Sequence, residues 1–261
     1  MIVVSASDEA FVPHFATMLH SAWFHNPNAE FFLLDCGIEL KTREVLESFA
    51  DKLSISLTII PIDLAGIVDL PKTDHWSAAA YARLLSPSYL PADAEKALYI
   101  DADCVIVSDL SELWAIELGS CLVAGVRDVA GRKAEIRKGN SDLPDYINTG
   151  VMLLSLTGWR DENLSTKALN YARENALLHV EQSALNTVAS DRIQLISEEW
   201  NFSLSQEFPR TSQRVAPCIV HFTGPRKPWL YKDVAFSSIY NCHRNATPYK
   251  TACPTRRYRS R

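Results

Sequence analysis

Two aspartates separated by one residue, Asp101 and Asp103, directly follow an apolar run at residues 97–100. Because side chains two residues apart project to the same side of an extended backbone, both carboxylates can reach one cation. Such a pair suits Mg²⁺ or Mn²⁺ bridging a diphosphate. A second apolar run begins at residue 104. The pattern therefore predicts a metal-binding turn between two buried strands. The alternative is that Asp101 and Asp103 have only a structural role, in a turn or as a helix cap.

The elements that must position this pair alternate along the first half of the chain. Apolar runs between helical patterns are typical of βαβ units around a largely parallel sheet. The predicted strands cover residues 2–6, 31–35, 57–62 and 97–100, and the predicted helices cover residues 12–24, 40–52 and 77–84. Ligands of an open parallel sheet bind beyond the carboxyl ends of its strands, where Asp8, Asp63 and the Asp101 pair would lie.

The second half of the chain is less regular. Strands are predicted at residues 122–126, 151–154 and 218–222, and helical segments at 167–176 and 181–188. A polar stretch at residues 131–145 and four prolines between residues 209 and 228 indicate loops. We expect one domain over residues 1–232, followed by a basic tail at 233–261 that is either disordered or in contact with a membrane.

The composition limits the function classes. The chain has 261 residues, 47% of them hydrophobic and 22% charged, which excludes a disordered chain and allows a large core. The formal net charge of −5 argues against a nucleic-acid partner, since binding a phosphate backbone needs an excess of Lys and Arg. Residues 244–261 nevertheless hold six basic residues and no acidic one. We therefore expect an acidic body and a basic tail.

Neither a spanning helix nor a signal peptide is expected. No run of about 18 apolar residues occurs, and the first residues lack both a basic region and a long apolar region. The six cysteines lie far apart and form no C-x-x-C motif. We interpret them as reduced thiols of a cytoplasmic protein.

A series of short motifs resembles glycosyltransferase family 8, in the order of that family and over about residues 1–232. The matching stretches are Ala6 and Asp8 after the first predicted strand, LLDCGI at 33–38, YARL at 81–84, KALYIDAD at 96–103, DLSELW at 109–114, NTGV at 148–151, EQSALN at 181–186 and HFTGPRKPW at 221–229. The resemblance implies a retaining, Mn²⁺-dependent enzyme with an α/β fold of the GT-A type, which binds nucleotide sugars. That fold has a mostly parallel central sheet with helices on both faces.

By this resemblance, Asp101 and Asp103 chelate the metal together with His221. Carboxylate and imidazole ligands suit Mn²⁺, with Mg²⁺ as the alternative ion. Gly224 would let a backbone N–H approach the diphosphate, and Lys227 would add positive charge beside the leaving UDP. A core histidine and a surface lysine are the structural alternatives for His221 and Lys227.

The resemblance also assigns residues to the donor nucleotide sugar. Asp8 would accept a hydrogen bond from uracil N3–H, Ala6 would leave space for the ring, and Ala102 would belong to the donor site. The residues expected to line the sugar are Arg83, Asp128 and Asn148. The alternatives are a helix cap for Asp8, a surface ion pair for Arg83, and turn positions for Asp128 and Asn148.

The resemblance places Gln182 beneath the anomeric carbon, and retention of configuration requires two inversions or a front-side substitution. Because an amide oxygen is a poor nucleophile, we favour front-side attack through a short-lived oxocarbenium ion–phosphate pair, with Gln182 stabilising the positive sugar. Glu181 replaces the Asp often found beside it and would also act at the reacting sugar. A polar first turn of a helix is the alternative for both. His75 and Trp76 are candidates for acceptor contacts or are surface loop residues.

These residues together predict transfer of glucose or galactose from a UDP-sugar to a saccharide acceptor, lipopolysaccharide or another cell-envelope glycan. The alternatives are a catalytically silent UDP-sugar-binding protein and a metal-dependent nucleotidyl- or phosphotransferase. The complete metal set disfavours the first, and the lack of a glycine-rich phosphate-binding loop disfavours the second. The basic tail indicates either peripheral contact with the anionic inner face of the cytoplasmic membrane or a disordered terminus.

Overall fold

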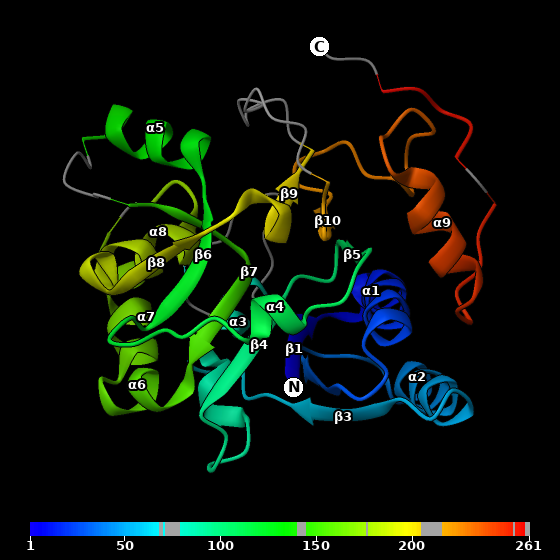
Figure 1. The fold of residues 1–261 in the computed structure, drawn as a ribbon, viewed down its shortest axis with the longest axis horizontal. Helices are drawn as coiled ribbons and strands as arrows, with labels where there is room; N and C mark the ends of the chain where they lie inside the picture. Colours follow the sequence, from blue (N-terminus) through cyan, green and yellow to red (C-terminus); the bar gives the residue numbers. More distant parts are fainter. Residues whose placement is uncertain are drawn as a thin grey trace.

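The computed structural model describes residues 1–67, 70, 79–139, 145–175, 177–204, 216–252 and 254–258. Its central sheet has seven strands in the order β3-β2-β1-β4-β7-β6-β8 (Figure 1). Their bounds are β1 (Ile2–Ser7), β2 (Glu30–Asp35), β3 (Ser56–Pro61), β4 (Lys96–Ile100), β6 (Val123–Arg127), β7 (Ile147–Ser155) and β8 (Ile193–Ile196). β7 is antiparallel to both neighbours, and the other neighbouring pairs are parallel. The predicted mostly parallel sheet is confirmed.

The central strands are apolar at almost every position because both faces of the sheet are covered. In β4, Leu98 and Ile100 pack into one core, and Ala97 and Tyr99 pack into the other. A strand buried on both sides shows no alternation of polar and apolar residues. This burial explains why the predicted strands appear in the sequence as continuous apolar runs.

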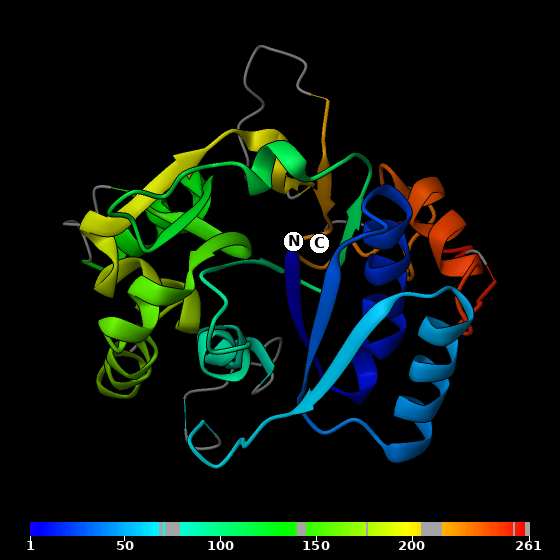
Figure 2. The same ribbon diagram turned by 60° about the horizontal axis from the view of Figure 1, so that its bottom comes forward.

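Helices cover both faces of the sheet, as Figure 2 shows. One face carries α1 (Val12–His25) and α2 (Leu40–Lys52). The other carries α3 (Ala79–Tyr89), α6 (Leu156–Asp161), α7 (Leu164–Glu174) and α8 (Val180–Val188). The 3.6-residue pattern that predicts the first helix is confirmed, since Phe15, Met18, Leu19 and Ala22 are all buried.

A second, smaller sheet brings distant parts of the chain to the end of β4. It contains β5 (Cys104–Ile106), β10 (Ile219–His221) and β9 (Phe202–Ser203), in the order β5-β10-β9. β5 and β10 are antiparallel, with His221 directly opposite Cys104. The Phe222 N–H also donates to the Asp103 carbonyl over 3.1 Å. This pairing places His221 beside the turn that follows β4.

The region after β6 differs from the expectation of a polar loop. Val129–Arg137 form α5, and Asp128 directly precedes the helix as its N-cap. The Asp128 side chain accepts a hydrogen bond from Gly131 N–H over 2.8 Å and so caps the first turn. The helix has little apolar periodicity, so Asp128 at its N-cap is the one sequence feature that indicates where it starts. The remaining short elements are η1 (Glu9–Phe11), α4 (Ser111–Trp114), η2 (Ser190–Arg192) and η3 (Glu198–Asn201).

Part of the basic tail is folded. α9 (Ser237–Asn245) packs against α1, and Figure 1 shows the two helices side by side. Tyr240 Oη lies 2.6 Å from His14 Nδ1, and Arg244 Nη1 donates to Tyr240 Oη over 3.1 Å. Arg244 is 6% exposed, so its charge is used inside the fold and does not belong to a basic surface. The domain boundary at residue 232 stays a prediction.

Other basic residues of the tail have different positions. Lys250, Arg256 and Arg257 are exposed, whereas Arg259 and Arg261 lie outside the described residues. Within the described ranges, no helix combines the length and the apolar character needed to cross a membrane. The described cysteines are free thiols, namely Cys36, Cys104, Cys121, Cys218 and Cys242.

Arg244→Met is expected to lower the free energy of unfolding by about 2 kcal/mol, because it leaves buried hydrogen-bond partners without a charged donor. These partners are Tyr240 Oη and the Tyr249 carbonyl. Urea denaturation of the purified chain measures the change. Lys250→Met is the matched control, since Lys250 is exposed and its loss should change stability by less than about 0.5 kcal/mol. Equal stabilities of the two variants would contradict a structural role for Arg244.

Candidate functional site

Asp101 and Asp103 lie in the turn between β4 and β5, at the carboxyl end of β4. Their side chains are 17% and 14% exposed, so they border solvent from a nearly buried position. Asp101 Oδ1 accepts a hydrogen bond from Tyr99 Oη at 3.0 Å and pairs with Arg83 Nη2 at 3.0 Å. Burial raises the pKa of Asp101 despite the nearby Arg83. Arg83 and Tyr99 therefore hold one oxygen of Asp101 in place.

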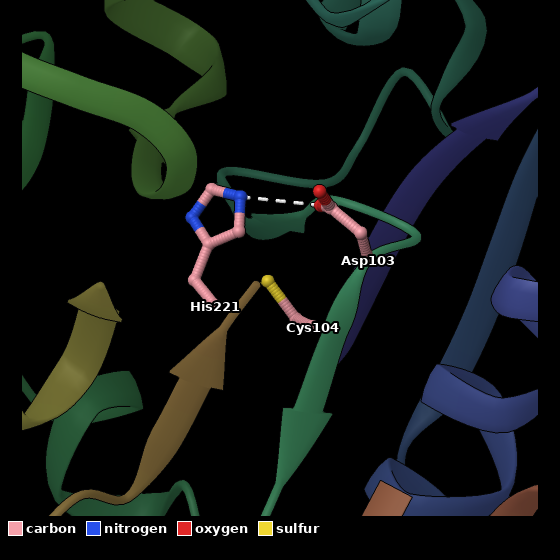
Figure 3. Close-up of side chains that lie close together, drawn as sticks. All are labelled: Asp103, Cys104 and His221. Atoms are coloured by element: carbon pink, nitrogen blue, oxygen red, sulfur yellow. Dashed lines mark ion pairs between the residues drawn. The ribbon is translucent and has the colours of Figure 1, made fainter. Parts of the chain in front are cut away.

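His221 joins the two aspartates from β10. Its Nε2 lies 3.1 Å from Asp103 Oδ1 and 3.8 Å from Asp101 Oδ2, and Figure 3 shows the ring facing Asp103. Its Nδ1 lies 2.9 Å from Asn201 Oδ1. Because a carboxamide oxygen only accepts hydrogen bonds, we infer that Nδ1 carries the proton. Nε2 is then the ring nitrogen that faces the carboxylates, which is the position of the ligating nitrogen in a metal-binding histidine.

Gly150, in β7, allows this close approach. A Cβ at this position would lie 2.2 Å from His221 Cε1 and 2.8 Å from Asp101 Oδ2. The Gly150 carbonyl also accepts the Asp101 N–H over 2.8 Å. Any side chain here would displace the imidazole or the carboxylate, so the site requires glycine at this strand position.

Lys227 contacts Asp103 from the loop after β10. Its Nζ lies 2.6 Å from Asp103 Oδ2 and donates to the Phe222 carbonyl over 2.5 Å. Burial alone would raise the pKa of Asp103, but Lys227 and His221 together hold that pKa well below its usual range. Asp103 is therefore ionised, with one oxygen toward Lys227 and the other toward His221.

Arg83, in α3, connects the aspartates to the neighbouring elements. Besides Asp101, its Nη1 donates to Thr149 Oγ1 over 2.9 Å, and its Nε lies 3.6 Å from Glu181 Oε1. The guanidinium carbon also lies 5.3 Å from the centre of the Tyr99 ring. Arg83 is 8% exposed, so the interpretation as a surface ion pair is wrong. Its positive charge lies beside the buried side chains of Asp101 and Glu181.

Glu181 is fully buried in the first turn of α8, and neither carboxylate oxygen has a hydrogen-bond partner. Burial raises its pKa to about 8, although Arg83 acts in the opposite direction. Near neutral pH the side chain is therefore held largely in the protonated form. This carboxyl group lies 3.6 Å from Arg83 and is available to a ligand that supplies hydrogen-bonding groups.

Glu181→Gln is expected to change the pH dependence of stability. Because the folded-state pKa is about 8 and the ordinary value is 4.5, the folded chain retains a proton that the unfolded chain loses. This group therefore makes the wild type less stable as the pH rises from about 4.5 to about 8. In the variant that contribution is absent, so its stability relative to wild type should increase by about 3 kcal/mol between pH 5 and 7.5.

Urea unfolding at the two pH values measures this difference. Glu47→Gln is the control, because Glu47 is exposed on α2. A constant difference between Glu181→Gln and wild type across this pH range would show that Glu181 is ionised in the folded chain.

Gln182, the next residue of α8, is held in one orientation. Its Oε1 accepts hydrogen bonds from Asn148 Nδ2 at 3.2 Å and Thr149 N–H at 3.3 Å. Its Nε2 donates to Asp128 Oδ2 over 2.9 Å. The carboxamide of Gln182 therefore connects Asp128 and Asn148. The sequence predicts all three residues in one site. Asp128 also caps the first turn of α5, in keeping with its interpretation as a turn residue, and its contact with the sugar stays a prediction.

A buried polar cluster supports this end of α8 from behind. Ser183 Oγ lies 2.9 Å from Tyr146 Oη and also donates to Glu135 Oε1. Glu135 is fully buried in α5, and its Oε1 lies 3.9 Å from His179 Nδ1. α5, which the sequence does not predict, is thus attached to the helix that carries Gln182.

The other predicted site residues either lie at the same edge of the sheet or fall outside the residues that the structure describes. Val4 pairs with Tyr99, so Ala6 and Asp8 reach the carboxyl end of β1 beside the Asp101 turn. Asp8 is half-buried and accepts a hydrogen bond from Phe11 N–H over 3.1 Å, which realises its cap interpretation. His75 and Trp76 lie outside the described residues.

At two residues of the predicted donor site, the main chain is the part that could contact a ligand. Ala102, between the two aspartates, is 6% exposed. Gly224 has φ of +70°, in the left-handed region, and a Cβ there would meet no atom within 4 Å. The backbone at Gly224 is therefore open to an incoming group.

Three residues that the sequence analysis did not single out hold the predicted ones in place. Tyr99 and Thr149 contact Asp101 and Arg83, and both lie inside motifs already recognised. Asn201 orients His221 and also donates to Asn148 Oδ1 over 2.9 Å. It follows Trp200 at the end of η3, where no periodic pattern marks it.

The residues present fit a divalent cation. Asp101, Asp103 and His221 direct two carboxylates and an imidazole nitrogen at one place, and Gly150 leaves the room they need. Hard or borderline divalent ions accept this mixture of oxygen and nitrogen donors. A bound cation would also compensate for the negative charge that the two aspartates bring together.

The chain is similar to known proteins over most of its length. A family model described as Glycosyl transferase family 8 matches residues 2–233. The chain is 27% identical over 251 residues to general stress protein A of Bacillus subtilis, covering 88% of this chain and 87% of that protein. It is 28% identical over 243 residues to lipopolysaccharide 1,2-glucosyltransferase of Escherichia coli, covering 87% of this chain and 72% of that protein.

The solved structures include a similar fold. The galactosyltransferase LgtC, in complex with donor and acceptor sugar analogues, matches with a TM-score of 0.83. The match covers 98% of each chain at 22% identity. At that level of identity, the likeness shows that the fold is shared.

Proposed function

This chain belongs to glycosyltransferase family 8, and from its site we propose that it transfers glucose or galactose from a UDP-sugar to a saccharide acceptor with retention of configuration. The fold is of the GT-A type. The observation that carries the proposal is the position of Asp103, which contacts His221 with one oxygen and Lys227 with the other. A carboxylate that can bind a metal ion, next to an ammonium group, suits a diphosphate leaving group.

Asp101, Asp103 and His221 would hold the divalent cation, Mn²⁺ or alternatively Mg²⁺. When bound, such an ion neutralises negative charge on a leaving diphosphate. Lys227 would exchange its contact with Asp103 for one with a diphosphate oxygen. At Gly224 the open backbone would let an N–H group approach the same diphosphate. These donors stabilise the charge that develops on the β-phosphate as its bond to the sugar breaks.

Gln182 would stabilise positive charge on the sugar. Its Oε1 is fixed by Asn148 and Thr149, so the amide dipole needs no reorientation during the reaction. The acceptor hydroxyl would attack from the face that the diphosphate leaves, and a diphosphate oxygen would take its proton. Arg83, Glu181, Asp128 and Asn148 would contact the sugar, and Asp8 with Ala6 would receive the uracil.

The proposed acceptor is a lipopolysaccharide or another cell-envelope glycan, since the Escherichia coli relative is named as a lipopolysaccharide glucosyltransferase. A lipid-linked acceptor would be reached from the cytoplasmic face of the membrane. Lys250, Arg256 and Arg257 are the exposed basic residues available for contact with an anionic leaflet. Arg244 is excluded from this surface because it is buried between α9 and α1.

Calorimetric binding of several UDP-sugars, with and without Mn²⁺, tests donor and cation together. We expect UDP-glucose or UDP-galactose to bind only when Mn²⁺ is present, and the bound sugar to be hydrolysed slowly without acceptor. Binding without turnover would favour the catalytically silent alternative. Absence of binding for every UDP-sugar, with or without Mn²⁺, would overturn the proposal.

A further inference from the structure

The thiol of Cys104 lies within the metal-ligand cluster, although the proposed transfer gives it no role. Cys104 is the first residue of β5 and is fully buried. It stands directly opposite His221 in the antiparallel ladder, where side chains of paired residues project to the same face. The same pairing that delivers the imidazole to the site therefore delivers the sulfur as well.

Three different donor atoms converge here. One ligand atom from each of Asp103, Cys104 and His221 lies within 4.8 Å of the others, and Figure 3 shows the three side chains together. Asp103 directs Oδ1 at His221 while Lys227 holds Oδ2. Asn201 holds Nδ1 of His221, so that Nε2 is the ring nitrogen on the Asp103 side. The imidazole and one carboxylate oxygen are thus already oriented toward a shared ion.

Asp101 is restrained differently. Arg83 and Tyr99 both hold its Oδ1, and its Oδ2 lies 3.8 Å from His221 Nε2, compared with 3.1 Å for Asp103 Oδ1. Of the two carboxylates, Asp103 is therefore the better placed to share an ion with the imidazole, and Cys104 is the further donor beside them.

We propose that Asp103, Cys104 and His221 form a second coordination mode of this site, which takes a thiophilic divalent cation such as Zn²⁺ or Cd²⁺. The proposal rests on the proposed function in that Asp103 and His221 are shared with the cation of the transfer reaction. On binding, the sulfur–metal bond forms as the thiol proton passes to solvent, and no redox change occurs. The Cys104 thiolate then replaces Asp101 as the third protein ligand.

The chemistry of the donors supports this division between ions. Carboxylate, thiolate and imidazole are the three ligand types of Zn²⁺, whereas Mg²⁺ and Mn²⁺ prefer oxygen. Donors of a tetrahedral zinc site lie about 3.3–3.7 Å apart, given bonds of about 2.0–2.3 Å. The cluster therefore needs to contract by about 1 Å at its widest pair. A thiophilic ion held this way excludes the transfer cation and inhibits the enzyme.

The direct test is titration of the purified full chain with Cd²⁺, in the absence of sugar nucleotide, followed by ultraviolet thiolate-to-metal charge-transfer absorption. We expect a saturable band that is lost in Cys104→Ala and retained in Cys36→Ala, a matched buried cysteine outside the cluster. Cys104→Val, which keeps the core filled, should lose the band as well. His221→Gln should weaken Cd²⁺ binding at least about tenfold. A band of unchanged intensity and affinity in both Cys104 variants would overturn the proposal.

Two readouts separate this proposal from the proposed function. The charge-transfer band requires no UDP-sugar, so it forms even if the chain binds no sugar nucleotide. Conversely, Mn²⁺-dependent UDP-sugar binding without a Cys104-dependent band would leave the transferase proposal intact and refute the thiolate site. In the active enzyme, the Zn²⁺ concentration for half-inhibition should rise at least about tenfold in Cys104→Ala. Equal inhibition of wild type and Cys104→Ala would refute the thiolate site too.

Discussion

Asp103→Asn is expected to lower kcat/KM for UDP-sugar turnover in Mn²⁺ about a thousand-fold, because one carboxylate serves two separate needs of the site. Its Oδ1 lies beside His221 Nε2, and its Oδ2 holds Lys227 Nζ at 2.6 Å. The amide of Asn has the same shape but no charge. It therefore can neither retain the divalent cation nor hold the Lys227 ammonium by an ion pair. Fold and packing should change little, since the substitution conserves volume.

The measurement is the rate of UDP-glucose or UDP-galactose hydrolysis at several Mn²⁺ concentrations. Asp93→Asn is the matched control, because Asp93 is exposed in the turn before β4 and lies outside the site. The variant should require more Mn²⁺ and should still be slow at saturation. Full recovery of the wild-type rate at high Mn²⁺ would mean that Asp103 only binds the ion and that its contact with Lys227 has no catalytic consequence.

Arg83→Met is expected to abolish turnover and also to lower the free energy of unfolding by about 3–5 kcal/mol. The guanidinium compensates Asp101 at 3.0 Å and faces Glu181 at 3.6 Å, both in nearly buried surroundings. Removing it leaves a buried carboxylate without its cation, which is far more unfavourable than losing an exposed ion pair. Thr149 Oγ1 loses its donor as well.

A double variant separates stability from chemistry. Arg83→Met with Glu181→Gln should recover part of the lost stability at pH values above about 8, where a Glu181 carboxyl would otherwise ionise beside the missing cation. It should stay inactive, since Asp101 is still without the guanidinium. Arg137→Met, on an exposed position of α5, is the control and should change stability by less than about 0.5 kcal/mol. A stable, inactive Arg83→Met would assign Arg83 to ligand contact alone.

Much of the fold could be predicted from the chain because its strands are buried on both faces. The apolar runs around residues 2–6, 31–35 and 97–100 coincide with β1, β2 and β4, and the pattern of α1 agrees with its buried face. α5 was missed because it has little apolar periodicity, and α9 was missed because its residues are mostly polar. Their positions depend on particular contacts, namely the Asp128 cap and the network of His14, Tyr240 and Arg244.

Part of the candidate site could likewise be predicted from the sequence. The spacing of Asp101 and Asp103 at the end of a buried strand, and the order of the motifs from Ala6 to Trp229, indicate the family and its chemistry without reference to any contact. Backbone geometry within one strand and its turn is local, so residue types at short spacing are sufficient to place both carboxylates at one strand end.

Contacts between distant segments could not be inferred in this way. The β5–β10 ladder sets His221 opposite Cys104, and Asn201 determines which imidazole nitrogen faces the carboxylates. Burial, with a smaller contribution from Asp101, raises the pKa of Glu181. Each depends on which chain segments pack together, and residues far apart in sequence acquire such neighbours only when the core excludes water around them. The aspartate pair therefore indicated a metal site from its spacing alone, whereas the position of the thiol in that site follows from the pairing of two strands.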